Sequence, residues 1–124
     1  MSEEEQKQNI VKRRWGYYEV LDEDATISEK FKIKMLHLFP NKSISKQYHN
    51  HREEYWIVLQ GMCELSLESE SAIKKRGDMI HVPKRTIHKL TNIGQNELIL
   101  LELQIGEKTE EEDIVRLEAI NGEV

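Results

Sequence analysis

The chain has 124 residues, of which 33% are charged and 38% hydrophobic, and its formal net charge is −5. This length fits one domain, and the acidic balance argues against a nucleic-acid partner, because binding phosphates requires a clustered positive field. The lone Cys63 cannot form an internal disulfide, and no apolar run approaches the about 20 residues that a membrane-spanning helix needs. We therefore expect a cytoplasmic protein with no membrane partner.

The chain opens with a polar stretch, for which we expect an N-terminal arm over residues 1–12, followed by a single domain over 13–124. Turn signals such as Gln60–Gly61 then separate short runs with strand character. A helical turn is expected near residue 109. Many short strands at this spacing predict an antiparallel sandwich or barrel. The expected strands cover residues 17–21, 31–39, 54–60, 62–67, 78–82 and 98–104.

The segment from Ser45 to His51 carries polar side chains at alternate positions. On a strand, Ser45, Gln47, His49 and His51 would all project from one face. A polar row on one face is usually the solvent face. Two histidines two residues apart change that interpretation, because neighbouring imidazoles on one face can converge on one metal ion.

The histidine pair belongs to a longer pattern of spaced residues. The pattern is His49-x-His51-x-x-Glu54, six residues and Gly61, followed further on by Gly77, Pro83, His88 and Asn92. This arrangement resembles the two motifs of the cupin superfamily, although Arg85 stands where the second motif usually has Gly. The resemblance implies an all-β cupin-type double-stranded β-helix, a jelly-roll barrel.

The same pattern predicts a metal site formed by His49, His51, Glu54 and His88. Three imidazoles and one carboxylate suit a divalent ion and leave one or two positions for water or substrate. Zn, Mn, Co, Ni and Fe all accept such a donor set, so the sequence leaves the metal open.

Three blocks outside the cupin motifs point to a subfamily. They are Arg13–Arg14–Trp15–Gly16, the stretch from Ser45 to Trp56, and Asp113–Ile114–Val115–Arg116. With these blocks the chain resembles the type II phosphomannose isomerase domain, which is usually fused behind a mannose-1-phosphate guanylyltransferase. The resemblance implies a metal-dependent aldose–ketose isomerase that interconverts mannose 6-phosphate and fructose 6-phosphate. A homodimer is the assembly we expect.

An isomerase needs a base and side chains that bind the substrate phosphate. We expect Glu53 and His81 as candidates for the base, because a carboxylate or imidazole on the metal is a poorer base than a free one. Arginine can contact phosphate through two hydrogen bonds and lysine as a point charge. The residues expected to bind the sugar phosphate are Arg13, Ser45, Gln47, Lys84 and Arg116.

Two other functions remain open from the sequence. One is a non-catalytic cupin that binds a sugar or nucleotide sugar as a sensor or accessory subunit, although binding alone would not require an open metal site. The other is an Fe(II) dioxygenase, since three histidines and a glutamate also suit Fe(II). The blocks around Trp15 and Val115 have no role in a dioxygenase.

Overall fold

The computed structural model describes residues 9–26 and 28–117. This part of the chain consists almost entirely of β-strands, with one 3-10 turn, η1 (Glu111–Asp113). The strands are β1 (Ile10–Arg13), β2 (Gly16–Asp24), β3 (Lys30–Leu38), β4 (Ser43–His49), β5 (Arg52–Gln60), β6 (Met62–Leu67), β7 (Glu70–Lys75), β8 (Met79–Val82), β9 (His88–Asn92), β10 (Leu98–Gly106) and β11 (Ile114–Arg116).

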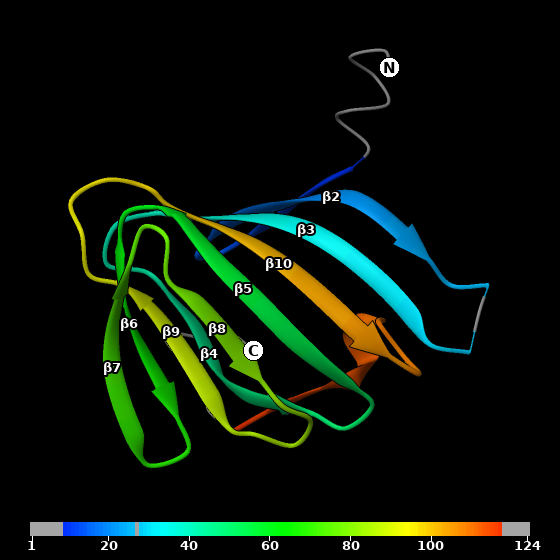
Figure 1. Cartoon of the computed structure of the whole chain (residues 1–124). Helices are drawn as coiled ribbons and strands as arrows, with labels where there is room; N and C mark the ends of the chain where they lie inside the picture. Colours follow the sequence, from blue (N-terminus) through cyan, green and yellow to red (C-terminus); the bar gives the residue numbers. More distant parts are fainter. Residues whose placement is uncertain (1–8, 27, 118–124) are drawn as a thin grey trace.

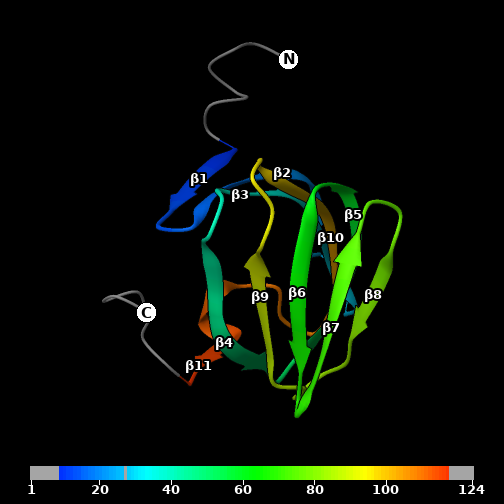
Figure 2. The same cartoon turned by 90° about the vertical axis from the view of Figure 1, so that its left-hand side faces the viewer.

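The strands form two antiparallel sheets. The first has the order β1-β2-β3-β10-β5-β8, and the second has the order β11-β4-β9-β6-β7. Figure 1 shows β2, β3, β10 and β5 running side by side, and the turned view in Figure 2 brings β4, β9, β6 and β7 to the front. The all-β antiparallel barrel expected from the sequence is confirmed. Among the described residues, no helix has the length and apolar character needed to cross a membrane.

The inner face of the first sheet changes from apolar to polar along its strands. On β10, Leu100 points inward and so do Glu102 and Gln104, all of them buried. The neighbouring strand follows the same division, because Leu100 pairs with Leu36 of β3 and Glu102 pairs with Lys34. The interior of the barrel therefore has an apolar half and a polar half next to each other.

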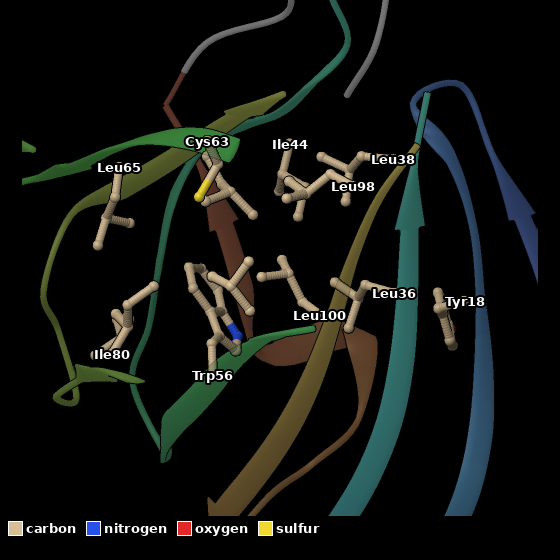
Figure 3. Packing of buried hydrophobic residues seen from close by; sticks show 13 residues of the cluster. Tyr18, Leu36, Leu38, Ile44, Trp56, Cys63, Leu65, Ile80, Leu98 and Leu100 are labelled. Atoms are coloured by element: carbon tan, nitrogen blue, oxygen red, sulfur yellow. The ribbon is translucent and has the colours of Figure 1, made fainter. Parts of the chain in front are cut away.

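The apolar half is the hydrophobic core, and both sheets contribute to it (Figure 3). Burying each leucine side chain stabilises the fold by about 1.5–3 kcal/mol. The buried residues are Tyr18, Leu36, Leu38, Ile44, Trp56, Val58, Cys63, Leu65, Ile80, Val82, Leu90, Leu98 and Leu100. Because this cluster is apolar and draws on both sheets, the barrel has support that does not depend on the polar half.

The six expected strands are present as β2, β3, β5, β6, β8 and β10, with shifted ends in all but β6, and the expected helical turn corresponds to η1. Strand β7 was not predicted from the sequence, because it is an exposed edge strand without apolar alternation. Strand β9 was not predicted either, because His88 and Asn92 point inward with Leu90, which removes the alternation of apolar with polar residues.

The expected arm over residues 1–12 needs a correction at its end. Residues 10–12 belong to β1, which pairs with β2, and Val11 packs against the core. Burial of Val11 explains why this stretch joins the sheet. Residues 1–8 of the expected arm, residue 27 and the last seven residues of the expected domain lie outside the described part of the chain.

Candidate metal centre and ligand cavity

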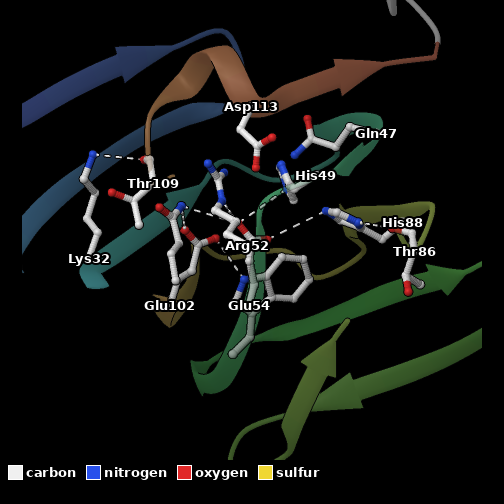
Figure 4. A network of polar contacts seen from close by, with 12 residues as sticks. Lys32, Gln47, His49, Arg52, Glu54, Thr86, His88, Glu102, Thr109 and Asp113 are labelled. Carbon is white, nitrogen blue, oxygen red and sulfur yellow. Dashed lines mark hydrogen bonds and ion pairs between the residues drawn. The ribbon is translucent and has the colours of Figure 1, made fainter. Parts of the chain in front are cut away.

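Three of the four predicted metal ligands come together in the polar half of the barrel. His49 ends β4, Glu54 is the third residue of β5, and His88 begins β9. Their side chains are almost fully buried, and Nε2 of His49 lies 3.5 Å from Oε2 of Glu54 while Nε2 of His88 lies 3.8 Å from Oε1. Figure 4 shows dashed lines that join each of the two imidazoles to the carboxylate.

The donor atoms of this cluster fit a metal ion. One potential ligand atom from each of His49, Glu54 and His88 lies within 4.8 Å of the others. Nε2 of His49 and Nε2 of His88 are buried without a hydrogen-bond partner among the described residues. Nδ1 of His88 lies 2.9 Å from the carbonyl oxygen of Thr86. A proton on this Nδ1 would donate to Thr86 and leave the lone pair of Nε2 facing the cluster, as in many metal-binding histidines.

The protonation of the cluster also suits a cation. Burial lowers the pKa of His88 and outweighs its attraction to Glu54, so the neutral imidazole that can bind a metal is favoured. Burial acts to raise the pKa of Glu54, but the nearby His49 and the guanidinium of Arg52 hold that pKa well below its ordinary value. The centre therefore presents two nitrogen donors and an anionic oxygen donor.

His51, the fourth predicted ligand, lies apart from these three. Nδ1 of His51 is 2.7 Å from Oδ1 of Asp113, and the backbone N–H of His51 donates to Oδ2 of the same carboxylate. Strand β4 ends at His49, so residues 50 and 51 form a turn and the alternation that would align His51 with His49 stops. The sequence pattern did not reveal that break.

A cavity of about 290 Å³ lies beside the cluster, and Glu54 belongs to both. Cationic side chains outnumber carboxyl groups in its walls, although the chain as a whole is acidic. The lining residues are Arg13, Arg14, Trp15, Tyr18, Lys34, Leu36, Ile44, Ser45, Gln47, Arg52, Glu54, Glu102, Gln104, Ile114 and Arg116.

Four of the five residues expected to bind the substrate line this cavity, namely Arg13, Ser45, Gln47 and Arg116. They come from β1, β4 and β11, which are far apart in the sequence. Lys84, the fifth, is exposed in the turn between β8 and β9 and is not among the lining residues. Its place in the sequence near His88 does not bring it into the barrel.

Several cavity residues were missed by the sequence analysis. Lys34, Arg52 and Glu102 point inward from β3, β5 and β10, and all three are buried. Arg52 donates from Nε to Oε2 of Glu54 at 3.2 Å and from Nη1 to the carbonyl oxygen of Glu110. A signal was available, because each residue lies two positions from another inward residue of its strand. Charged residues in strands are normally assigned to the solvent face, so the signal was not used.

Glu102 is a second buried carboxyl group that lines the cavity. It accepts hydrogen bonds from Nε1 of Trp56 at 2.9 Å and from Nε2 of Gln104 at 2.6 Å. Burial and the negative charge of Glu54 raise the pKa of Glu102 above its ordinary value. The cavity thus holds two buried carboxyl groups whose pKa values are shifted in opposite directions.

The two candidates for a catalytic base, Glu53 and His81, lie outside the barrel. Glu53 is one residue from Glu54 and so points to the opposite face of β5, where it lies 3.4 Å from Nε2 of His81. The ring of His81 stacks on Tyr55 with centroids 4.5 Å apart. These contacts are on the outer face of the sheet, and neither side chain lines the cavity. The prediction that they act on a ligand in the barrel therefore disagrees with their placement.

Solved structures with the same fold define the class of this domain. The cupin domain of Schizosaccharomyces pombe Cnp3 has a TM-score of 0.67 and 17% sequence identity, over 75% of this chain and 65% of that chain. At this identity the likeness shows the fold alone. The two-sheet barrel with its inward histidines is a cupin domain. Residues 1–119 match the family described as Mannose-6-phosphate isomerase C-terminal, and the chain belongs to this family.

Curated relatives correct the predicted activity. Mannose-1-phosphate guanylyltransferase ManC of Salmonella typhimurium is 32% identical over 92% of this chain and 23% of its own length. Xanthan biosynthesis protein XanB of Xanthomonas campestris is 34% identical over 90% of this chain and 23% of its own length. The chain thus spans about a quarter of these relatives. They are named for guanylyl transfer and polysaccharide synthesis, so the prediction of a mannose-6-phosphate isomerase is wrong, although the family name mentions that activity.

Proposed function

We propose that this domain binds a phosphorylated mannose in the barrel cavity and serves as a ligand-binding domain for guanylyl transfer to mannose 1-phosphate. The observation that carries the proposal is the concentration of cationic side chains in the cavity of an acidic chain. Guanidinium groups are suited to phosphate, and Arg13, Arg14 and Arg116 lie in the walls of the cavity. The names of the relatives supply the ligand to be tested, mannose 1-phosphate.

The size of the cavity supports a monosaccharide. At about 290 Å³ it lies at the small end of the range of about 300–1,000 Å³ that small-molecule sites occupy. A hexose phosphate suits such a volume better than a nucleotide sugar, which carries a base and a second sugar. We therefore place the phosphorylated sugar itself, rather than its nucleotide derivative, in the barrel.

Uncharged polar side chains in the cavity wall support recognition of the sugar. Ser45, Gln47 and Gln104 offer hydroxyl and amide groups that can donate or accept hydrogen bonds. Such groups discriminate strongly between ligands, because a ligand that fails to pair with them leaves a buried polar group unsatisfied.

We propose that His49, Glu54 and His88 hold a divalent ion at the inner end of this cavity. When bound, the ion would supply positive charge and open coordination positions for hydroxyl oxygens of the sugar. The choice among Zn, Mn, Co, Ni and Fe, and a part for His51 in the ligand set, belong to the same proposal. So does a homodimeric assembly.

Calorimetric titration of mannose 1-phosphate and of mannose tests the proposal. If Arg13 and Arg116 hold the phosphate, replacing either with alanine should weaken binding of mannose 1-phosphate by about 1.5–3 kcal/mol, the range for hydrogen bonds to charged groups. Arg76→Ala is the matched control, since Arg76 is exposed in the turn between β7 and β8, away from the cavity. Equal affinity of the wild type for mannose and mannose 1-phosphate would contradict the proposal.

A further inference from the structure

The outer face of the first sheet is apolar over several strands. The outward side chains of β10 include Leu101 and Leu103, which lie between β3 and β5. In the sheet register, Leu103 pairs with Ile33 on one side and with Tyr55 on the other, and Leu101 pairs with Ile57. We call the outward side chains of β3, β10, β5 and β8 the outer apolar face. Figure 1 shows β3, β10 and β5 of this sheet side by side.

This composition is unusual for a chain in which 33% of the residues are charged. The outward positions of β3 and β10 contain no Lys, Arg, Asp or Glu. The second sheet shows the contrast, because Lys46, Glu64 and Lys89 occupy its outward positions on β4, β6 and β9. A contiguous apolar patch rimmed by polar groups marks an interaction site in most soluble proteins.

The outer apolar face carries both a hollow and a projection. The hollow has a volume of about 490 Å³ and is walled mainly by Ile33, Ile57, Leu101 and Leu103. At its lip stands Met79 of the edge strand β8, whose side chain is 73% exposed, the most exposed of the large hydrophobic residues described. Methionine is flexible and fills irregular apolar gaps well.

A projection and a hollow on the same face fit a two-fold contact between identical chains, since in such a contact each copy supplies both parts. The net charge of the chain also favours a second copy as the partner. Two copies of a chain with net charge −5 repel each other least across a face that is almost free of charged groups. The face is also extensive: β3, β10 and β5 have nine residues each, which makes each strand about 30 Å long at about 3.3 Å per residue, and β8 extends the face at its edge.

We propose that the outer apolar face joins two copies of this chain, with Met79 of each copy entering the hollow of the other. The ligand cavity is lined by side chains that point into the barrel, away from the outer apolar face, so the dimer leaves both cavities accessible. The proposal does not depend on what the cavity binds. It gives a surface to the homodimer and accounts for an apolar face that the binding function leaves unused.

Sedimentation equilibrium of the full chain, with Met79→Lys, Leu103→Lys and Ile73→Lys variants, tests this interface. Ile73 is the matched control, because it is 63% exposed but lies on β7 of the other sheet. We expect a wild-type dimer at micromolar concentration, at twice the 14.7 kDa of the chain. Each charge placed on the face should raise the dimer dissociation constant at least about tenfold, while Ile73→Lys should leave it unchanged.

Circular dichroism and mannose 1-phosphate titration of the variants separate loss of the interface from unfolding. Met79→Lys is the safer variant for folding, because its side chain is already exposed to solvent. A wild type that stays monomeric at micromolar concentration would overturn the proposal and leave the face to a different partner. Dimers that persist unchanged in both Met79→Lys and Leu103→Lys would overturn it as well.

Discussion

Arg85 occupies a backbone conformation that favours glycine. Its φ is +62°, in the left-handed region, and its N–H donates to the carbonyl oxygen of His49 at 2.7 Å. This is the position at which the second cupin motif usually has Gly, and the structure gives the reason: the turn that leads to His88 needs a positive φ there. The departure from the motif therefore affects backbone strain, while the exposed Arg85 side chain does not line the cavity.

Replacing Arg85 with glycine should therefore stabilise the domain. A left-handed conformation costs a non-glycine residue about 1–2 kcal/mol, and glycine loses about 0.5–1 kcal/mol through greater freedom in the unfolded chain. We expect Arg85→Gly to raise the free energy of unfolding by about 0.5–1 kcal/mol, measured in urea. The neighbouring Lys84 has no positive φ, so Lys84→Gly should lower the stability. A loss of stability in Arg85→Gly would show that the turn is not strained.

The two buried histidines make a direct prediction about metal content. If His49 and His88 hold the ion, replacing either with alanine should remove most of the bound metal found by elemental analysis of the purified protein. The barrel should stay folded, because the apolar core lies in the other half of the interior. His81→Ala is the control, since His81 is on the outer face. Stoichiometric metal in both His49→Ala and His88→Ala would mean that the ligands are misassigned.

At the scale of elements, Asp113 ties the C-terminal segment to the turn between β4 and β5. Its carboxylate accepts hydrogen bonds from the backbone N–H groups of Asn50 and His51 and lies 2.7 Å from Nδ1 of His51. The turn joins the strands that carry His49 and Glu54. Burial acts to raise the pKa of Asp113, but the contacts with His51 and Asn50 outweigh it and lower that pKa.

This tie should make stability depend on pH in a defined direction. Because the folded-state pKa lies below the ordinary value of 3.8, the stabilisation is fully present above that value and is lost as pH falls through the folded-state pKa. Near neutral pH, Asp113→Asn should cost about 1–3 kcal/mol of unfolding free energy. The difference from wild type should shrink in acid. Asp78→Asn, which alters another turn carboxylate, is the control. A difference that does not change with pH would contradict this account.

The sequence could predict the elements whose inner faces follow simple rules. The spacing of His49, Glu54 and His88 identified a cluster that the fold brings together. The sequence is less informative where one residue decides the direction of a side chain. Glu53 and Glu54 are adjacent, so they point to opposite faces of β5. His51 lies just beyond the end of β4, and no motif shows where that strand stops.

The sequence analysis missed the polar half of the barrel for a related reason. Strand β10 alternates Leu101 and Leu103 with Glu102 and Gln104, a pattern that normally places the leucines inside. Here the polar pair points inward, and the leucines form part of the outer apolar face. Only the packing of β10 between β3 and β5 shows which face is the interior.

At the scale of the whole molecule, one half of the barrel interior stabilises the fold and the other half offers the binding cavity. The apolar core supports the fold, while cationic side chains outnumber carboxyl groups in the cavity wall, against the acidic balance of the chain. A bound phosphate would add negative charge to this wall. We therefore expect the ligand to raise the thermal stability of the domain, because a ligand that binds only the folded state shifts the unfolding equilibrium.

The most direct test of this account is calorimetric titration of mannose 1-phosphate into protein loaded with a divalent ion and into the same protein after chelation and dialysis. The account predicts binding to the loaded form with a stoichiometry of one ligand per chain. It predicts weaker binding to the stripped form, in which the arginines remain but the ion is missing. Mannose should bind the loaded form much more weakly than mannose 1-phosphate. Absence of binding to the loaded protein would contradict the account.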